Sequence, residues 1–214
     1  DAAVYESGAA ENHIDTAVRW SQSFDLFDVG LYWFRGTNRD PRFELSQNNG
    51  QSVLIPFYEQ IDQIGFDGQA TIDSWLWKLE LLWRDSDIEQ YSAMQGGVEY
   101  TFYGIQDSAT DIGVLVEYGW DERGEDATAA FQNDLFIGSR ITLNDVASTE
   151  FLAGFGYDLD YQSESLFVEA SRRFGDNWKL SLDGRLFNAG EPEDQLVNFI
   201  EQDDLIQLTA EYYF

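Results

Sequence analysis

Apolar and polar residues alternate along most of this chain with the period of two that is typical of β-strands. In the segment 75–84, tryptophan and leucine occupy every odd position, while Lys78, Glu80 and Arg84 share the even positions with two leucines. The segment 204–214 repeats the pattern and ends with Tyr212 and Phe214 on its apolar face. This alternation predicts strands whose two faces meet different surroundings.

The same pattern predicts about eleven strands, most of them roughly ten residues long. Strands in soluble proteins average about five or six residues, whereas a tilted strand of about ten residues crosses the apolar band of an outer membrane, which is roughly 25 Å tall. The sequence therefore predicts an all-β fold: an antiparallel, up-and-down transmembrane β-barrel that forms one domain over residues 1–214. The expected strands are 13–22, 26–36, 61–72, 75–84, 93–103, 111–120, 132–143, 148–158, 164–174, 177–188 and 204–214.

Tight turns and long polar segments alternate between the expected strands. The tight turns are 73–74, 144–145 and 175–177, with 104–110 as a looser one, and the long segments are 37–60, 121–131 and 189–203. Outer-membrane barrels have short periplasmic turns and longer external loops, so we place Phe214 in the periplasm. Bacterial barrels have even strand numbers, and we therefore expect about twelve strands. We expect the further strand either within residues 1–10 or upstream of them. If it lies upstream, the chain is an N-terminally incomplete fragment.

Aromatic side chains on the apolar face gather near both ends of the expected strands. Barrel proteins carry such residues as girdles at the two membrane interfaces. The alternative is a water-soluble sandwich or jelly roll whose aromatic residues fill a core, because alternation alone fits either architecture. The residues that we expect to face lipid are Trp20, Trp33, Trp75, Trp77, Trp83, Trp120, Trp178, Tyr212 and Phe214.

The last ten residues, Leu205-Ile-Gln-Leu-Thr-Ala-Glu-Tyr-Tyr-Phe214, end in phenylalanine, with apolar residues alternating upstream. This segment resembles the C-terminal signal of Gram-negative outer-membrane β-barrel proteins, and the segments 121–124 and 136–145 look similar to uncharacterised proteobacterial barrels. The resemblance implies the bacterial outer membrane as the location and the barrel-assembly machinery as a transient partner. It carries over no functional residues.

The opposite face of the expected strands holds charged residues of both signs. A charged side chain in lipid costs roughly 2–4 kcal/mol at the bilayer midplane, so we expect these residues inside the barrel. They either fill a narrow lumen as a structural network of ion pairs, which we favour, or line a water path. The expected lumen residues are Arg19, Asp67, Lys78, Glu80, Glu99, Glu117, Arg140, Glu150, Glu169, Arg173, Lys179, Asp183, Arg185 and Glu211.

The composition limits the function further. Asp and Glu number 40 against 12 Lys and Arg, a formal net charge of −28, which excludes nucleic acid as a partner. The 43% hydrophobic and 16% aromatic content excludes a disordered chain. The chain has no cysteine, so disulfides, thiol catalysis and cysteine metal sites are excluded.

Two features nominate chemistry. His13, the only histidine, lies two residues before Asp15 and suggests a hydrolytic pair at the external rim. No serine nucleophile motif accompanies it, so we favour an exposed rim histidine and expect no enzyme and no cofactor. Asp121, Glu122, Glu125 and Asp126 offer oxygen ligands for Ca²⁺, but their spacing is not that of a dedicated calcium loop, and no metal site is expected.

Three functions stay open at this point. The leading one is an integral outer-membrane barrel that serves as a narrow, porin-like channel or as a structural component of the envelope, with lipid, lipopolysaccharide and an envelope protein as partners. The second is an outer-membrane hydrolase that uses His13 and Asp15. The third is a soluble secreted β-protein that binds carbohydrate through exposed aromatic residues.

The excess of acidic residues generates a first prediction, because most of it falls in the loops and turns. Mg²⁺ or Ca²⁺ should reduce the mutual repulsion there and bridge to anionic lipopolysaccharide, which raises the melting temperature gradually. Calorimetric titration measures the binding. A tight one-to-one calcium isotherm would contradict this diffuse binding and make 121–126 a metal site.

Overall fold

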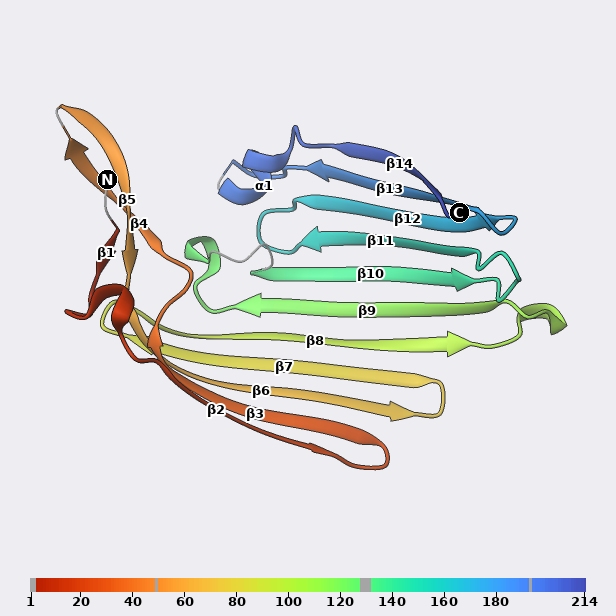
Figure 1. Cartoon of the computed structure of the whole chain (residues 1–214), viewed down its shortest axis with the longest axis horizontal. Coiled ribbons are helices and arrows are strands. Elements are labelled where there is room, and N and C mark those ends of the chain that lie inside the picture. Colours follow the sequence, from red (N-terminus) through yellow and green to blue (C-terminus); the bar gives the residue numbers. More distant parts are fainter. Residues whose placement is uncertain (1–2, 49, 128–131, 193) are drawn as a thin grey trace. The chain divides into compact units, whose positions relative to one another are not determined.

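The computed structural model describes residues 3–48, 50–127, 132–192 and 194–214, and these residues form an all-β protein (Figure 1). All eleven expected strands are present in one antiparallel sheet, and each begins and ends within three residues of the expected bounds. The strands of this sheet are β2 (Thr16–Ser23), β3 (Phe27–Thr37), β6 (Gln60–Ile72), β7 (Trp75–Ser86), β8 (Gln90–Phe102), β9 (Asp111–Asp121), β10 (Asn133–Thr142), β11 (Glu150–Asp158), β12 (Glu164–Phe174), β13 (Trp178–Asn188) and β14 (Leu205–Tyr212).

The strands of the large sheet follow the order β14-β13-β12-β11-β10-β9-β8-β7-β6-β3-β2. Consecutive strands are therefore neighbours, as in an up-and-down meander, except that the chain leaves the sheet between β3 and β6. The order ends at β14 and β2, and neither sheet closes on itself within the described residues. The antiparallel sheet of eleven strands is confirmed, and barrel closure stays a prediction.

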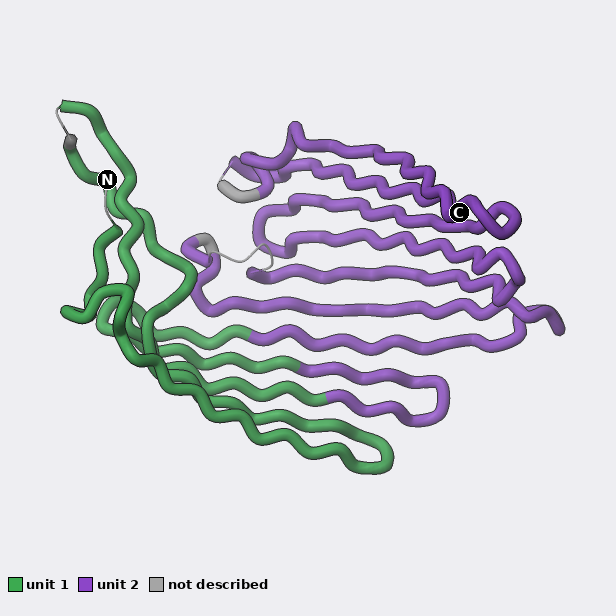
Figure 2. The backbone as a smooth tube through the Cα atoms, in the orientation of Figure 1, with its two compact units in different colours: residues 1–68, 80–93 green, residues 69–79, 94–214 purple. Residues whose placement is uncertain are grey.

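The chain divides into two compact units, which Figure 2 shows in different colours. Unit 1 comprises residues 1–68 and 80–93, and unit 2 comprises residues 69–79 and 94–214. The strands β6, β7 and β8 contribute residues to both units.

Unit 1 contains a second, three-stranded sheet that the sequence analysis did not anticipate. β4 (Arg42–Asn48) and β5 (Gln51–Tyr58) form an antiparallel hairpin within the expected loop 37–60. Gly50, with a φ of +80°, provides the left-handed backbone that a tight hairpin turn requires. β1 (Val4–Tyr5) pairs with β5 in parallel, so the described residues 3–10 supply no twelfth strand to the large sheet.

Helical segments are short and lie in the connections. The 3₁₀ turns are η1 (Ala10–Asn12), η2 (Ile105–Asp107) and η3 (Gly124–Asp126), and α1 (Gln195–Ile200) lies within the expected loop 189–203. Asp194 caps α1, because its side chain accepts a hydrogen bond from the backbone N–H of Val197 at 3.0 Å. Within the described residues, no helix is long and apolar enough to cross a membrane.

The large sheet presents most of its apolar side chains on one face, which we call the apolar face, and most of its charged side chains on the other, the polar face. On the apolar face of β7, Trp75, Trp77 and Leu79 are 43%, 49% and 40% exposed. Among the described residues, Ile61 and Tyr91 are the only buried hydrophobic side chains. A soluble domain buries most of its large aliphatic and aromatic residues, whereas this chain leaves them on the surface of a sheet.

A strip of phenylalanines crosses the polar face of unit 2. Phe136 lies 6.1 Å from Phe167, and Phe167 lies 6.1 Å from Phe187, as measured between ring centroids. The Phe136 ring covers Gly154 so closely that a Cβ atom at position 154 would lie 2.1 Å from Phe136 Cζ. Glycine therefore makes room for this ring on the neighbouring strand.

We expect Gly154→Ala to displace the Phe136 ring and to lower the free energy of unfolding by about 1–3 kcal/mol, the usual cost of overpacking. Gly184→Ala is the matched control in the same sheet, because the nearest atom to a Cβ there lies at 3.7 Å. Urea unfolding in detergent measures both variants. Equal stability of the two would show that the Phe136 ring does not require the glycine.

Candidate functional site

A hollow of about 450 Å³ lies on the polar face of unit 2, over the strands β10 to β14. Its charged lining consists of five of the expected lumen residues: Arg140, Glu150, Glu169, Lys179 and Asp183. The register of the sheet brings them together. Glu169 on β12 is directly opposite Asp183 on β13 and, on its other side, Leu152 on β11. Leu152 is in turn directly opposite Arg140 on β10. The period-two alternation predicts that these residues share one face, and the pairing between strands brings them together in one hollow.

The other expected lumen residues lie outside this hollow. Arg19 donates to Asp67 at 2.9 Å in unit 1, and Arg185 donates to Asp183 at 3.2 Å in unit 2. These two are the only ion pairs among the fourteen expected lumen residues in the described part of the chain. This is sparse pairing for a structural network. Arg173 lies over the Tyr213 ring, and Glu211 is opposite Lys179. Glu99 lies beside Gly113, and Glu117 lies beside Gly97. Lys78 and Glu80 take alternate positions of β7.

The aromatic residues of the apolar face form ring contacts in unit 2. Between ring centroids, Trp75 lies 5.8 Å from Trp77 and 4.6 Å from Tyr100, and Trp178 lies 5.0 Å from Tyr212. Of the residues expected to face lipid, Trp20, Trp75, Trp77, Trp178, Tyr212 and Phe214 are exposed, and Trp33, Trp83 and Trp120 are partly buried. In unit 1, the indole N–H of Trp33 donates to Asp62 at 2.9 Å, so this tryptophan has a polar anchor.

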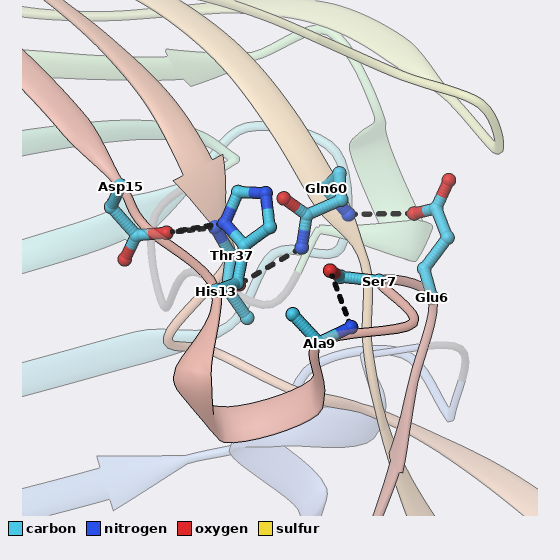
Figure 3. Close-up of polar contacts among 7 residues, drawn as sticks. All are labelled: Glu6, Ser7, Ala9, His13, Asp15, Thr37 and Gln60. Atoms are coloured by element: carbon cyan, nitrogen blue, oxygen red, sulfur yellow. Dashed lines mark hydrogen bonds and ion pairs between the residues drawn. The ribbon is translucent and has the colours of Figure 1, made fainter.

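His13 and Asp15 do meet, in a polar cluster of unit 1 that Figure 3 shows. His13 Nδ1 lies 3.0 Å from Asp15 Oδ1, and the same oxygen accepts the backbone N–H of Thr37 at 2.9 Å. The bond from Thr37 and the bond from His13 hold the pKa of Asp15 below its usual range. The amide side chain of Gln60 donates to Thr37 Oγ1 at 2.9 Å, and the backbone N–H of Gln60 donates to Glu6.

This cluster connects the N-terminal segment to the end of β3 and the start of β6. A hydrolytic histidine needs a nucleophile within hydrogen-bond reach. Among the described residues, the only hydrogen bond of the His13 side chain is to Asp15, and Ser7 Oγ instead accepts the backbone N–H of Ala9 at 3.3 Å. The contacts are those of a structural clamp.

The acidic segment 121–126 is also held by structural contacts. Arg123 binds both carboxylate oxygens of Asp121, at 2.9 and 2.8 Å, and Asp121 is only 4% exposed. The side chain of Glu125 lies outside the described part. No group of three or more histidine or carboxylate side chains is placed to hold a metal ion in the described residues.

Two features of the large sheet in unit 2 were not predicted from the sequence: the contacts of Asp158 and the phenylalanine strip. Asp158 is buried at the end of β11, where Oδ1 accepts the backbone N–H groups of Asp160 and Tyr161, each at 2.7 Å. An aspartate at the boundary of a strand and a tight connection is the local signal for such a turn. The phenylalanine strip described above was visible as Phe136, Phe167 and Phe187 at polar-face positions of the alternation.

A scan of protein-family models, a search of curated proteins and a search of solved structures each found no match to this chain. The fold itself defines the class: an all-β protein dominated by an antiparallel sheet of eleven strands. One face of that sheet is apolar and exposed, and the other is charged.

The clamp generates a prediction about pH. The folded-state pKa of Asp15 is lower than its unfolded-state pKa, so its stabilisation is fully present above about pH 4 and is lost as the pH falls through the folded-state value. Asp15→Asn should therefore lower the free energy of unfolding by about 1–3 kcal/mol at neutral pH, and the difference from the wild type should shrink in acid.

Denaturant unfolding at a series of pH values measures this difference. Asp25→Asn is the control, because Asp25 lies in the short connection after β2 without a side-chain hydrogen bond in the described residues. A difference between Asp15→Asn and the wild type that does not change with pH would contradict the role of the carboxylate charge.

Proposed function

We propose that this chain is an integral outer-membrane β-barrel without catalytic activity, whose polar face surrounds a narrow, charged, water-accessible interior. The observation that carries the proposal is the exposed apolar face of long strands in a chain with almost no core. Trp20, Trp77 and Tyr212 are about half exposed, and the described residues contain only two buried hydrophobic side chains.

Water is a poor solvent for this face. Removing apolar surface from water is worth roughly 25 cal/mol per Å², so a sheet of this size would gain much free energy from an apolar phase. A second packed layer could provide that phase in a soluble sandwich, but in the described residues the remaining elements are one small sheet and short helical segments. Lipid meets the requirement without a further layer.

The free edges of the large sheet also support a barrel. β2 and β14 carry unpaired backbone N–H and C=O groups on one side, and each such group costs several kcal/mol inside a bilayer. A transmembrane sheet therefore has to close on itself, with or without a further strand. The C-terminal resemblance adds the barrel-assembly machinery as the partner that inserts it, and lipopolysaccharide as its surroundings.

The polar face favours a channel over a filled structural interior. Only two ion pairs join its expected lumen residues in the described part, and a hollow of about 450 Å³ is lined by five of these residues, of which only Asp183 belongs to an ion pair. A filled network would bring most of these charges into direct contact. We therefore propose a narrow, porin-like channel, and keep a structural envelope component as the version without conductance.

The chain contains no cysteine, so two neighbouring leucines of β7 provide a matched test of the two faces. Leu81 lies on the apolar face and is 40% exposed, and Leu82 lies on the polar face. In outer-membrane vesicles, Leu82→Cys should react with a water-soluble maleimide and Leu81→Cys should not, because adjacent strand residues point to opposite faces and the reactive thiolate forms only in contact with water. The reverse result would invert every face assignment.

Two further measurements separate the versions of the proposal. A protein that stays monomeric in buffer without detergent would be a soluble β-protein, and the membrane location would be wrong. Conductance in planar bilayers tests the channel, and a complete absence of current at every voltage would leave only the structural version.

A further inference from the structure

The hollow in unit 2 has a floor built from three successive levels of the β12–β13 ladder. Glu169 and Asp183 form one directly opposed pair, Ser171 and Ser181 form the next, and Arg173 and Lys179 form the third. All but Arg173 line the hollow. Along these two strands, the serine pair with its two hydroxyl groups therefore separates the acidic pair from the basic pair.

Four charged side chains of this hollow have no protein partner. Arg140, Glu150, Glu169 and Lys179 make no hydrogen bond or ion pair in the described part of the chain, whereas Asp183 pairs with Arg185 at 3.2 Å. Two of the four are basic residues and two are acidic residues. The hollow thus offers unpaired side chains of both signs to a ligand.

The register explains why three of these four charges stay free, and Lys179, the fourth, faces both a like and an opposite charge. Glu169 faces the like charge of Asp183 across the ladder, Arg140 faces Leu152, and Glu150 faces Ser171. Lys179 lies between Arg173 on β12 and Glu211 on β14. Like charges in direct opposition destabilise a sheet, so this arrangement costs free energy that a ligand of the right charges would recover.

The spacing along β13 sets the size of that ligand. Lys179 and Asp183 are four residues apart, a Cα distance of about 13 Å in a strand. An extended peptide spans about 3.3–3.6 Å per residue, so the two ends of a peptide of three or four residues fit this separation. The hollow of about 450 Å³ is within the usual range of small-molecule sites.

We propose that this hollow binds a dipolar solute, a short peptide with free termini, with its ammonium group at Glu169 and Asp183 and its carboxylate at Lys179. Ser171 and Ser181 then meet the peptide groups between the two ends, and Leu152 offers an apolar contact beside Glu169. This inference deepens the proposed function by naming a solute class for the interior.

Other ligand classes fit the hollow less well. An anion would meet three carboxylates, and a simple cation would meet Arg140 and Lys179. An uncharged sugar would displace water from charged side chains without compensating their charge, which is costly. A zwitterion replaces the lost hydration at both ends with charge-assisted hydrogen bonds.

Tri-alanine is the probe, and saturation-transfer NMR on the full chain in detergent is the measurement, because it detects weak binding. We expect tri-alanine to bind, and N-acetyl-tri-alanine amide, which lacks both terminal charges, to bind at least tenfold more weakly. Glu169→Gln and Lys179→Gln should each weaken tri-alanine binding at least tenfold. The exposed residues Glu201 and Arg39 provide the controls Glu201→Gln and Arg39→Gln, which should leave binding unchanged.

Equal binding of the free and the blocked peptide to the wild type would overturn the proposal, and this comparison needs no variant to fold. Binding of maltotriose in place of tri-alanine would also overturn it and would identify a sugar site. The proposal that the chain forms a membrane barrel is tested separately, because that test uses the labelling of Leu81→Cys and Leu82→Cys and not peptide binding.

Discussion

The whole structure depends on the strict alternation of side chains between the two faces of a β-strand. The strands of the large sheet place all their tryptophans and most of their other large apolar residues on one side and most of their charged residues on the other, and the antiparallel ladders keep these faces continuous from strand to strand. The sheet therefore separates two environments. The small number of buried hydrophobic residues in the described part of the chain follows directly, because most apolar side chains lie on one surface of a single layer.

The polar face shows a second consequence of the same alternation. Ladder register, and not sequence proximity, determines which charges become neighbours, so Glu169 meets Asp183 while Arg140 meets Leu152. Glu169 and Arg140 make no ion pair in the described residues, and both line the hollow. Glycines on this face allow large rings to lie flat against the sheet, as Phe136 does over Gly154. The face is thus partly aromatic and partly charged.

The N-terminal region is held by a different kind of interaction. Asp15 joins His13 to the backbone of Thr37, and Gln60 joins Thr37 to Glu6, so one small polar cluster fixes the ends of several segments. The pair that resembled catalytic residues in the sequence has its hydrogen bonds committed within this clamp. A carboxylate with two donors at the end of a strand is a common structural device, and it needs no reaction to explain it.

The sequence alone determined the eleven long strands, their antiparallel order and the assignment of residues such as Trp75 and Lys78 to opposite faces, because the period of two is a local property that each segment carries by itself. It missed the hairpin of β4 and β5, where short strands with Pro56 in one of them interrupt the long-strand pattern. It also gave Arg140, Glu169 and Lys179 only as members of one face. Only the tertiary structure decided that they share a hollow, since the register between strands depends on contacts between residues far apart in the chain.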